Sequence, residues 1–429
     1  MKNKKETLLI LIILITICII IFNRDKLYEA KYTEPKDTLL AITINGEIST
    51  TFPTTKYYET SVECTTGTGK VEWNGTKWVL TTSGITKGST KCNATFITKV
   101  PTLAEAILAN NEVKTPITTP GAAISTASEA LLASTEDDYG TSYYFRGAVK
   151  NNYVQFANKC WRIVRVGGDG SVTLILHNDN TSNAANPCSS ANNSTNAAFA
   201  RYSGTTYISA FNTNYNDNAY VGFMYGTAGA SDYASAHANT HKSTILTNLQ
   251  TWYNNNLKTY EKVIDDTVWC NDKTNVTDTT FNLWNWSNVT GLGYGTNTTF
   301  YGATQRLISK SGSAGGTSPS LKCTGELSKI NSKVGLITAD ELAFAGYAYG
   351  LKNTTTYLQE NATDTYWWSL SPYYFYGSYA SVWNVGGDIG LFGNSYVYST
   401  FGVRPLISLK STTNATGNGT SNSPFIISM

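Results

Sequence analysis

Charged side chains are scarce in this sequence, and histidine is scarcer still. Asp, Glu, Lys and Arg make up 14% of the 429 residues, against roughly a quarter in ordinary globular domains. The net charge is only +2, and no basic run interleaved with aromatic residues occurs, so we expect no nucleic-acid partner. Metal binding has little support, because two of the three histidines, His237 and His241, lie four apart in a stretch of poor helix propensity.

Signatures of common catalytic sites are missing as well. The sequence holds no serine-hydrolase elbow, phosphate-binding loop or HExxH motif. The adjacent acids Asp340 and Glu341 leave an envelope enzyme that cleaves glycans open as an alternative, since glycosidases use two carboxylates. Neighbouring side chains on a helix point apart, however, and Glu341 suits a helix cap better. We therefore expect no catalytic residues, no metal and no cofactor.

Tyrosine, tryptophan and small polar residues are abundant instead. The chain has 28 Tyr and 10 Trp, and aromatic residues reach 12%. Together with many Gly, Ser, Thr and Asn residues, this mixture favours strands and turns over long helices. Hydrophobic residues at 41% can build a substantial core, and the length corresponds to about two or three domains.

The N-terminus carries a long apolar run. Lys2, Lys4 and Lys5 precede it, and it extends from Leu8 to Phe22. The run is short for a membrane span and long for the apolar part of a signal peptide, and no small-x-small cleavage site follows it. We expect an uncleaved transmembrane helix in residues 1–30, a single-pass location in the cell membrane and a C-terminal ectodomain outside.

Six cysteines follow Cys18, and none of them forms a CxxC or zinc-binding spacing. An even number of cysteines outside an anchor indicates disulfides. Sequence neighbours predict the pairs Cys64–Cys92, Cys160–Cys188 and Cys270–Cys323. The sequence leaves other pairings open, as well as six free buried thiols.

Residues 31–100 read as a small β-sandwich-like module. In "VEWNGTKWVLTT", Asn74-Gly75 predicts a type I′ turn that places Val71 opposite Trp78 and Glu72 opposite Lys77. Asn45-Gly46 predicts a second hairpin. Residues 101–138 read as a short helix over 102–113 and a linker rich in Pro, Thr, Ser and Ala, with a brief helix near 129–133.

A larger domain is expected over residues 139–429. Its middle, 178–243, reads as loop, and the apolar spacing in 243–263 predicts a helix with Ser243 as its N-cap. "TADE" predicts a capping box between Thr338 and Glu341. Trp367, Trp368 and Trp383 read as core residues, and Arg404 as half of a structural ion pair. Asp137 and Asp138 read as turn caps.

The stretch "YWWSLSPYYFYGSYASVWNVGGDIGLFGNSYVYSTFGVRP" (366–405) has one acid, Asp388, and one base, Arg404. Aromatic side chains give large contact area at low entropy cost, and Ser, Gly and Asn give adaptable hydrogen bonds. The composition is typical of a contact surface on a rigid scaffold.

Several motifs resemble a group of surface proteins from gut Firmicutes and wall-less relatives. They are "DDYGTSYYFRGAVKNNYVQFANKCWRIVRVGGDGSVTLIL", "WCNDK", "GLITADELAFAG", "YWWSLSP", "FGVRPLISL" and "GNGTSNSPFIIS". The closing "GVRP" pattern is similar to C-type-lectin-like folds, which include formylglycine-generating-enzyme-like domains and the variable proteins of diversity-generating retroelements. The resemblance implies an α+β chain, in which a C-type-lectin-like domain of short mixed strands, few helices and long loops follows the β module.

In variable proteins of that kind, adenine-directed mutagenesis fills a fixed scaffold with Tyr, Asn, Ser, Asp and Gly. The resemblance therefore implies a ligand-binding set within 366–405: Tyr373, Tyr374, Tyr376, Ser378, Tyr379, Ser381, Asn384, Asn394, Ser395, Tyr396 and Tyr398. Calcium-dependent sugar motifs of true C-type lectins are not matched, because Trp383-Asn384 is followed by Val385.

The expected function is binding rather than catalysis. We expect a membrane-anchored adhesin or receptor-like protein, whose macromolecular ligand is a protein or glycan on another cell, a host or a phage. A structural surface-layer protein is the second alternative, beside the glycan-active enzyme.

Overall fold

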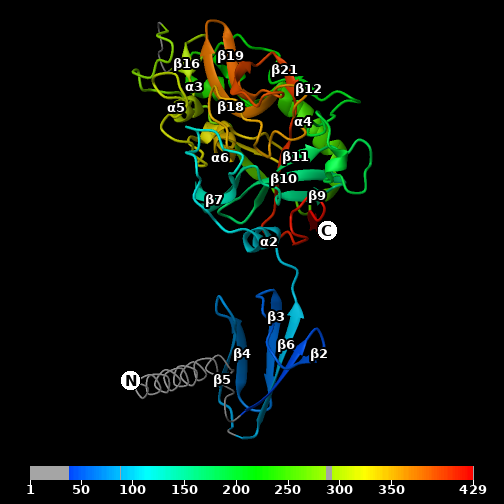
Figure 1. Ribbon diagram of the computed structural model, residues 1–429. Helices are drawn as coiled ribbons and strands as arrows, with labels where there is room; N and C mark the ends of the chain where they lie inside the picture. Colours follow the sequence, from blue (N-terminus) through cyan, green and yellow to red (C-terminus); the bar gives the residue numbers. More distant parts are fainter. Residues whose placement is uncertain (1–37, 87, 287–291, 429) are drawn as a thin grey trace, which may run out of the picture. The chain divides into compact units, whose positions relative to one another are not determined.

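The computed structural model describes residues 38–86, 88–286 and 292–428. The chain divides into two compact units, Met1–Val100 and Pro101–Met429 (Figure 1). Strands account for 36% of the residues and helices for 14%. The expected α+β class is therefore wrong, and the protein is mostly β. Short, alternating apolar segments separated by Gly and Asn turns favour strands over helices throughout.

The expected membrane anchor, residues 1–30, lies outside the described residues. Within the described part of the chain, no helix is both long and apolar enough to cross a bilayer. This finding corrects the expected fold class, with its N-terminal transmembrane helix, and the expected single-pass membrane location.

The first unit has two β layers. A four-stranded sheet has the order β2-β1-β6-β3, and β1 and β6 run parallel. A separate hairpin pairs β4 with β5. Ile42, Ala94 and Phe96 of the sheet pack with Val71 and Trp78 of the hairpin. The strand bounds are β1 Thr38–Ile44, β2 Glu47–Ser49, β3 Tyr58–Cys64, β4 Thr68–Trp73, β5 Trp78–Ser83 and β6 Thr90–Thr98.

The two predicted hairpin turns differ in outcome. Asn45 and Gly46 have φ values of 51° and 89°, which confirms the second hairpin between β1 and β2 and fits a type I′ turn. The register predicted at Asn74-Gly75 is wrong, because Trp73 pairs with Trp78. The Asn74 side chain accepts hydrogen bonds from the backbone N–H groups of residues 76 and 77, at 3.0 and 2.9 Å, and this bonding extends the loop to four residues.

An eight-stranded sheet forms the base of the second unit. Its main path is β22-β11-β10-β9-β24-β23, and β8 joins β10 to β7. The C-terminal strand β24 pairs with β9, and the N–H of Leu103 at the start of α2 donates to the carbonyl of Thr413. The strand bounds are β7 Ala130–Asp137, β8 Gly140–Gly147, β9 Tyr153–Phe156, β10 Lys159–Val166, β11 Val172–Asn178, β22 Leu406–Leu409, β23 Ala415–Thr416 and β24 Phe425–Ile427.

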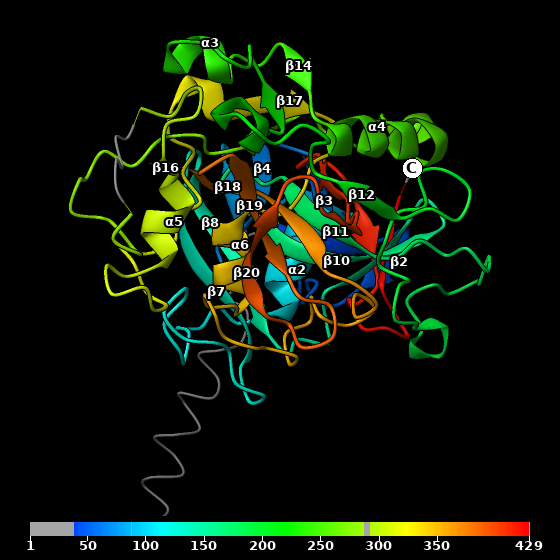
Figure 2. The same ribbon diagram turned by 90° about the horizontal axis from the view of Figure 1, so that it is seen from above.

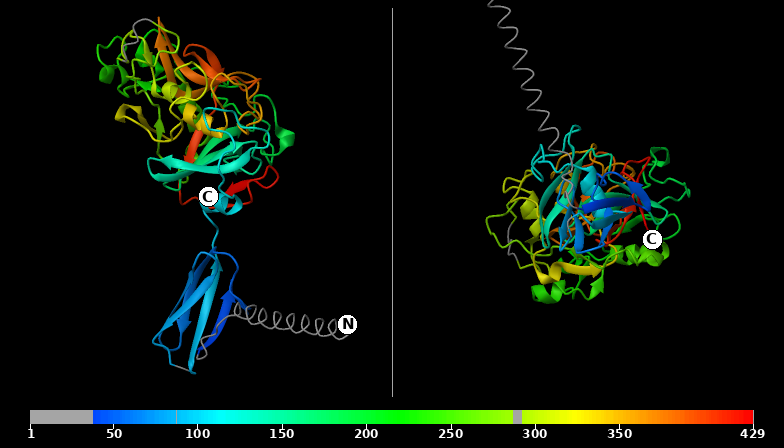
Figure 3. Two further views of the ribbon diagram at one scale, coloured as in Figure 1. Left: turned by 60° about the vertical axis from the view of Figure 1, so that its left-hand side comes forward. Right: turned by 90° about the horizontal axis from the view of Figure 1, so that it is seen from below.

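A six-stranded sheet has the order β12-β21-β18-β19-β20, with β16 pairing to β18. Two further pairs, β13–β14 and β15–β17, complete the strands. The bounds are β12 Ile208–Ala210, β13 Met224–Tyr225, β14 His241–Lys242, β15 Thr267–Cys270, β16 Thr299–Phe300, β17 Lys329–Ser332, β18 Trp367–Tyr376, β19 Tyr379–Val385, β20 Phe392–Tyr396 and β21 Thr400–Gly402. Within the second unit, the β18–β19 hairpin lies at the end opposite to α2 (Figures 1 and 3).

The helices begin where polar caps predict. Thr102 and Thr338 each form a capping box, with Glu105 and Glu341, and Ser243 caps α4, so the three predicted helices are confirmed. Helices α4 and α5 flank the β18–β19 hairpin on opposite sides (Figure 2). The α-helix bounds are α2 Leu103–Asn110, α3 Tyr233–His237, α4 Thr244–Asn256, α5 Gly302–Leu307 and α6 Ala339–Ala345; 3-10 turns occupy Ser190–Asn192, Asn218–Val221, Lys258–Tyr260 and Glu326–Ser328.

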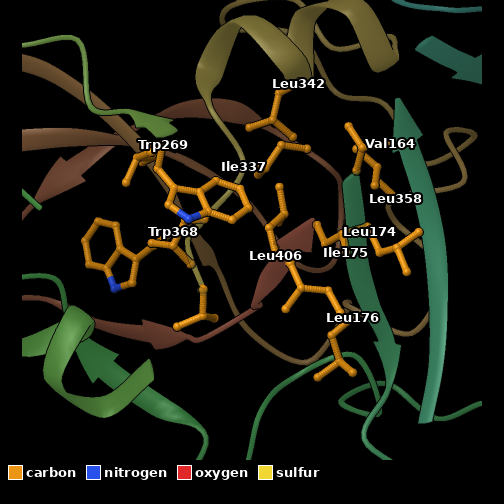
Figure 4. Close-up of a cluster of buried hydrophobic side chains, with 14 of the residues drawn as sticks. Val164, Leu174, Ile175, Leu176, Trp269, Ile337, Leu342, Leu358, Trp368 and Leu406 are labelled. Atoms are coloured by element: carbon orange, nitrogen blue, oxygen red, sulfur yellow. The ribbon is translucent and has the colours of Figure 1, made fainter. Parts of the chain in front are cut away.

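A continuous hydrophobic core joins the two large sheets. Leu174 and Leu176 of β11 meet Leu406 of β22, and Leu342 of α6 and Trp368 of β18 close the cluster (Figure 4). All five side chains are fully buried. Both faces of β10, β11, β18 and β19 are covered, so nearly every residue of these strands is buried, polar residues included.

The three predicted disulfides are confirmed: Cys64–Cys92, Cys160–Cys188 and Cys270–Cys323. Cys64 and Cys92 lie directly opposite each other on β3 and β6. Disulfides form and persist in oxidising environments.

Residues 101–138, which the sequence divides into a short helix and a linker, contain α2 and also β7. The brief helix expected near 129–133 is wrong, because these residues enter β7 and pair with β8. Glu129, just before β7, forms a fully buried ion pair with Arg146 at 3.0 Å. The ion pair and the β7–β8 ladder attach this segment to the large sheet.

Candidate functional site

The predicted ligand-binding stretch forms a hairpin and the edge strand beside it. Strand β18 turns into β19 at Gly377-Ser378, where Gly377 has a φ of 66°. Glycine at the first central position fits a type II′ turn, which matches the twist of paired strands. Tyr376 then lies opposite Tyr379, and Ser381 on β19 lies opposite Tyr396 on β20. This register gathers the exposed tyrosines near one end of the sheet.

Four exposed tyrosines form a connected cluster, in which each ring contacts at least two of the others. Tyr379, Tyr396 and Tyr398 come from the predicted stretch, and Tyr215 joins them from the segment before α4. The ring centroids of Tyr215 and Tyr398 lie 4.8 Å apart, and those of Tyr379 and Tyr396 lie 4.7 Å apart. Each side chain remains 38–41% exposed. Four adjacent rings that stay this accessible form a prepared contact area.

A second aromatic group lies at the other strand of the same hairpin. Trp286 stacks on Tyr376, with centroids 3.7 Å apart, and also packs edge-on against Tyr374 at 5.1 Å. Trp284 contacts Trp286 at 4.5 Å. Trp284 and Tyr376 are 39% and 40% exposed, while Trp286 and Tyr374 are half-buried. Both tryptophan rings also pack against the buried ring of Phe300.

We call these two groups together the aromatic surface: Tyr215, Trp284, Trp286, Tyr374, Tyr376, Tyr379, Tyr396 and Tyr398. Between Tyr366 and Tyr398 the sequence has one charged residue, Asp388. It lies in the loop between β19 and β20, at the opposite end of β19 from the Gly377-Ser378 turn. Burial raises the pKa of Tyr374 to about 12, so this hydroxyl stays neutral at physiological pH. The surface therefore offers rings and neutral hydroxyls rather than charge.

The eleven predicted residues divide into three groups. The exposed ones are Tyr376, Ser378, Tyr379, Tyr396 and Tyr398. Tyr374, Asn394 and Ser395 are half-buried. Tyr373, Ser381 and Asn384 are at most 1% exposed. These three do not reach a ligand in this structure, because β18 at Tyr373 and β19 at Ser381 and Asn384 are covered.

Three members of the aromatic surface were missed from the sequence. Tyr215 lies in "NTNYNDNAY", and Trp284 and Trp286 lie in "NLWNWSN". Both segments combine aromatic residues with Asn and lack Lys and Arg, as the predicted stretch does. The aromatic and Asn-rich composition of these two segments could have indicated them. They lie over 80 residues before the β18–β19 hairpin, however, and only the fold brings them into contact with it.

The predicted core role of Trp367, Trp368 and Trp383 is confirmed, since each is fully buried. The ion pair predicted for Arg404 is wrong. Its guanidinium donates to the carbonyls of Leu176 and Leu358 and lies 5.0 Å from the Trp367 ring. No ion pair involves Arg404 among the described residues, and Glu360, which acts on it electrostatically, pairs with Arg162. These carbonyl groups and the face of the Trp367 ring therefore contact the Arg404 guanidinium in place of the expected carboxylate.

The acids that left glycan cleavage open are bound to arginines. Asp340 accepts two hydrogen bonds from Arg306, at 2.7 and 2.8 Å, and Glu341 accepts one from Arg165 at 3.1 Å. Asp137 accepts from Arg165 at 3.1 Å and also from the Tyr139 N–H, as predicted for a turn cap. These groups line a cavity of about 60 Å³, where the ion pairs connect β7, β10, α5 and α6.

No cluster of three or more His, Cys, Asp or Glu in the described part of the chain is arranged to hold a metal ion. His237 and His241 lie on different elements, α3 and β14. His237 is buried, and its Nε2 lies 2.6 Å from the Gly293 carbonyl.

Comparison with known proteins relates part of the chain to a protein family. Residues 247–411 match the family described as a domain of unknown function (DUF6273). The matched part runs from α4 to the end of β22 and contains the β18–β19 hairpin, Trp284 and Trp286, but not Tyr215. No curated protein and no solved structure matches the chain.

Proposed function

We propose that this protein binds a macromolecular ligand, a protein or a glycan, through the aromatic surface. The observation that carries the proposal is the contact among Tyr215, Tyr379, Tyr396 and Tyr398, each still about two-fifths exposed. Monomeric proteins rarely display several adjoining exposed aromatic rings without a partner for them. The proposal is also supported by the sequence resemblance to retroelement variable proteins, which implies ligand-binding residues in the same stretch.

Binding at this surface relies on contact area and hydrogen bonds rather than on charge. Tyrosine and tryptophan bury large areas with few rotatable bonds, so little side-chain entropy is lost. Mutual stacking holds the rings in place before a ligand arrives, as for Trp286 and Tyr376. Because the surface lacks charge, we expect an association that depends little on salt.

Diversification of the exposed residues is part of the proposal. The variable set is limited to the exposed and half-buried positions, because Tyr373, Ser381 and Asn384 are in the core. The test is genomic. A reverse-transcriptase gene and a near-copy of the 366–405 coding segment, differing at adenines, should lie near the gene. A locus without either contradicts this part of the proposal.

The binding proposal is tested with arrays of proteins and glycans probed by the purified chain. Partners found this way should lose affinity by at least tenfold when Tyr379 and Tyr398 are both changed to Ser, as expected when aromatic anchors are removed. The matched control is Tyr139→Ser, because Tyr139 is 63% exposed and lies in the β7–β8 turn outside the aromatic surface. Equal binding by the double variant, or loss in the control as well, contradicts the proposal.

A further inference from the structure

Arg404 is a fully buried cation that has no carboxylate of its own. Glu360, the acid that acts on it electrostatically, forms its ion pair with buried Arg162 at 3.0 Å. Exposed Lys150 lies 3.9 Å from the same carboxylate oxygen. Two buried guanidinium groups therefore share one carboxylate among the described residues, and one positive charge in the interior is left without a counter-charge. A buried charge without a counter-charge is strongly destabilising.

Unpaired polar atoms surround this guanidinium. Its carbonyl acceptors belong to Leu176 and Leu358, whose direct neighbours in the chain are His177 and Tyr357. His177 and Tyr357 are at most 2% exposed. The Nδ1 atom of His177, the Oη atom of Tyr357 and the Nη2 atom of Arg404 form no hydrogen bond within the described part of the chain. Each buried polar group left in this way lowers the stability of the fold.

The unpaired atoms are donors of hydrogen bonds. The Asn361 Nδ2 atom lies 3.2 Å from the His177 Nε2 atom, and Asn361 Oδ1 accepts from the Ser194 N–H, which fixes the orientation of the amide. Nε2 is therefore an acceptor, and the proton of the neutral imidazole is on Nδ1. The indole Nε1 of Trp367 is a further unpaired donor among the described residues, and its ring lies 5.0 Å from the guanidinium carbon of Arg404.

We propose that Arg404 Nη2 and Tyr357 Oη bind a buried chloride ion. An anion accepts hydrogen bonds from all sides and supplies the negative charge that the second guanidinium lacks. A buried water molecule has to donate its own protons as well as accept, whereas guanidinium, indole and Nδ1–H groups can only donate. Because these side chains are enclosed, the site favours a monatomic anion over a larger carboxylate or phosphate.

The direct test is crystallographic, with bromide in place of chloride. The full-length chain is unfolded in urea with its disulfides intact, refolded in sodium bromide and crystallised from it. An anomalous difference peak from bromide should lie within hydrogen-bonding distance of Arg404 Nη2 and Tyr357 Oη. The proposal is overturned if no such peak is present, because water then satisfies these donors.

A second measurement follows the ion in solution. Urea unfolding is recorded over a series of sodium chloride concentrations, and sodium gluconate keeps the ionic strength constant. The folded chain binds one chloride and the unfolded chain does not. The equilibrium constant for folding should therefore rise tenfold for each tenfold increase in chloride above the dissociation constant. A folding constant that does not depend on chloride contradicts the proposal.

Two buried tyrosines provide a matched pair of variants. Tyr357→Phe removes only the proposed donor and should weaken chloride binding about tenfold, the value of one hydrogen bond. Tyr347→Phe is the control, because Tyr347 also acts electrostatically on Arg404 but donates its hydroxyl to Gln359 Oε1 at 2.9 Å. The control should lose stability equally at every chloride concentration and keep the chloride dependence of the unchanged protein. Equal chloride dependence in Tyr357→Phe and the unchanged protein overturns the proposal.

Discussion

Trp286 and Tyr376 stack with their ring centroids 3.7 Å apart and their planes inclined by 14°. Tyr376 is the last residue of β18, whereas Trp286 belongs to the long connection between β15 and β16. The contact therefore fixes a distant segment against the tip of the β18–β19 hairpin. It also keeps one face of Tyr376 covered while the side chain remains 40% exposed, so the ring is held in place before any ligand binds.

The first prediction measures this stacking. In a double-mutant cycle of Trp286→Leu and Tyr376→Leu, the coupling energy in the free energy of unfolding should be about 0.5–1.5 kcal/mol, the usual value for an aromatic pair. Chemical denaturation of the four proteins gives the number. Coupling near zero would mean that the two rings are not held together in solution, and the pre-organised surface would lose its basis.

The sequence predicted local features of the fold well. Capping residues at Thr338 and Ser243, the glycine turn at Gly46 and the three disulfides all depend on neighbours in sequence or on cysteine order. The fold class was wrong because strands predominate: β7 was expected to be a linker with a brief helix, and β12, β13 and β14 lie in the segment that was expected to be loop. Strand β7, "ALLASTED", has an apolar half and a polar half, and its pairing with β8 rather than its own pattern makes it a strand.

The position of the candidate site in the sequence could be predicted, but which residues form its exposed surface could not. Composition marks 366–405 as an uncharged aromatic stretch, yet strict alternation cannot tell an exposed residue from a buried one when both faces of a strand are covered. Ser381 and Asn384 illustrate this, since neighbours on either side of β19 are equally buried. Tyr215 and Trp286 join the surface through tertiary contacts that a single sequence does not reveal.

The second prediction is a loss of stability in mild acid. Burial lowers the pKa of His177 well below its ordinary value of 6.5, and the positive charges of Arg162, Arg404 and Lys150 lower it further. Burial also lowers the pKa of His237, to about 3. Below pH 6.5 the unfolded chain binds these protons and the folded chain does not. Stability is therefore fully present above pH 6.5 and falls with pH, by about 1.4 kcal/mol per pH unit for each histidine.

Urea unfolding at pH 7.5 and pH 5.5 checks this prediction. The free energy of unfolding should be about 3 kcal/mol lower at pH 5.5, and His237→Gln should remove about half of the difference. Glutamine keeps an amide donor that can reach the Gly293 carbonyl. Stability that stays level or rises between the two pH values would show that the histidines are not buried as neutral groups.

The third prediction concerns the buried pair of Glu129 and Arg146. Arg146 also donates to the carbonyls of Ala343 and Phe344 at the end of α6, both at 3.0 Å. Glu129→Gln leaves this guanidinium buried without its counter-charge, which should lower the free energy of unfolding by about 3–5 kcal/mol. Glu136→Gln is the control on β7, because Glu136 is exposed, and should cost well under about 1 kcal/mol. Equal costs for both variants would contradict the structural role of the pair.

The last prediction separates the predicted ligand-binding residues by burial. Tyr373 is fully buried beside Trp383, with ring centroids 4.7 Å apart, so Tyr373→Ala leaves a cavity and should lower the free energy of unfolding by about 3–5 kcal/mol. Tyr379→Ala removes an exposed ring and should cost at most about 1 kcal/mol while abolishing most of the ligand affinity. Denaturation should therefore show the larger loss of stability in Tyr373→Ala, and Tyr379→Ala should lose most of the ligand affinity with little loss of stability. If Tyr379→Ala destabilises the protein as much as Tyr373→Ala does, then the tyrosines of the aromatic surface serve the fold, and ligand binding must be sought elsewhere.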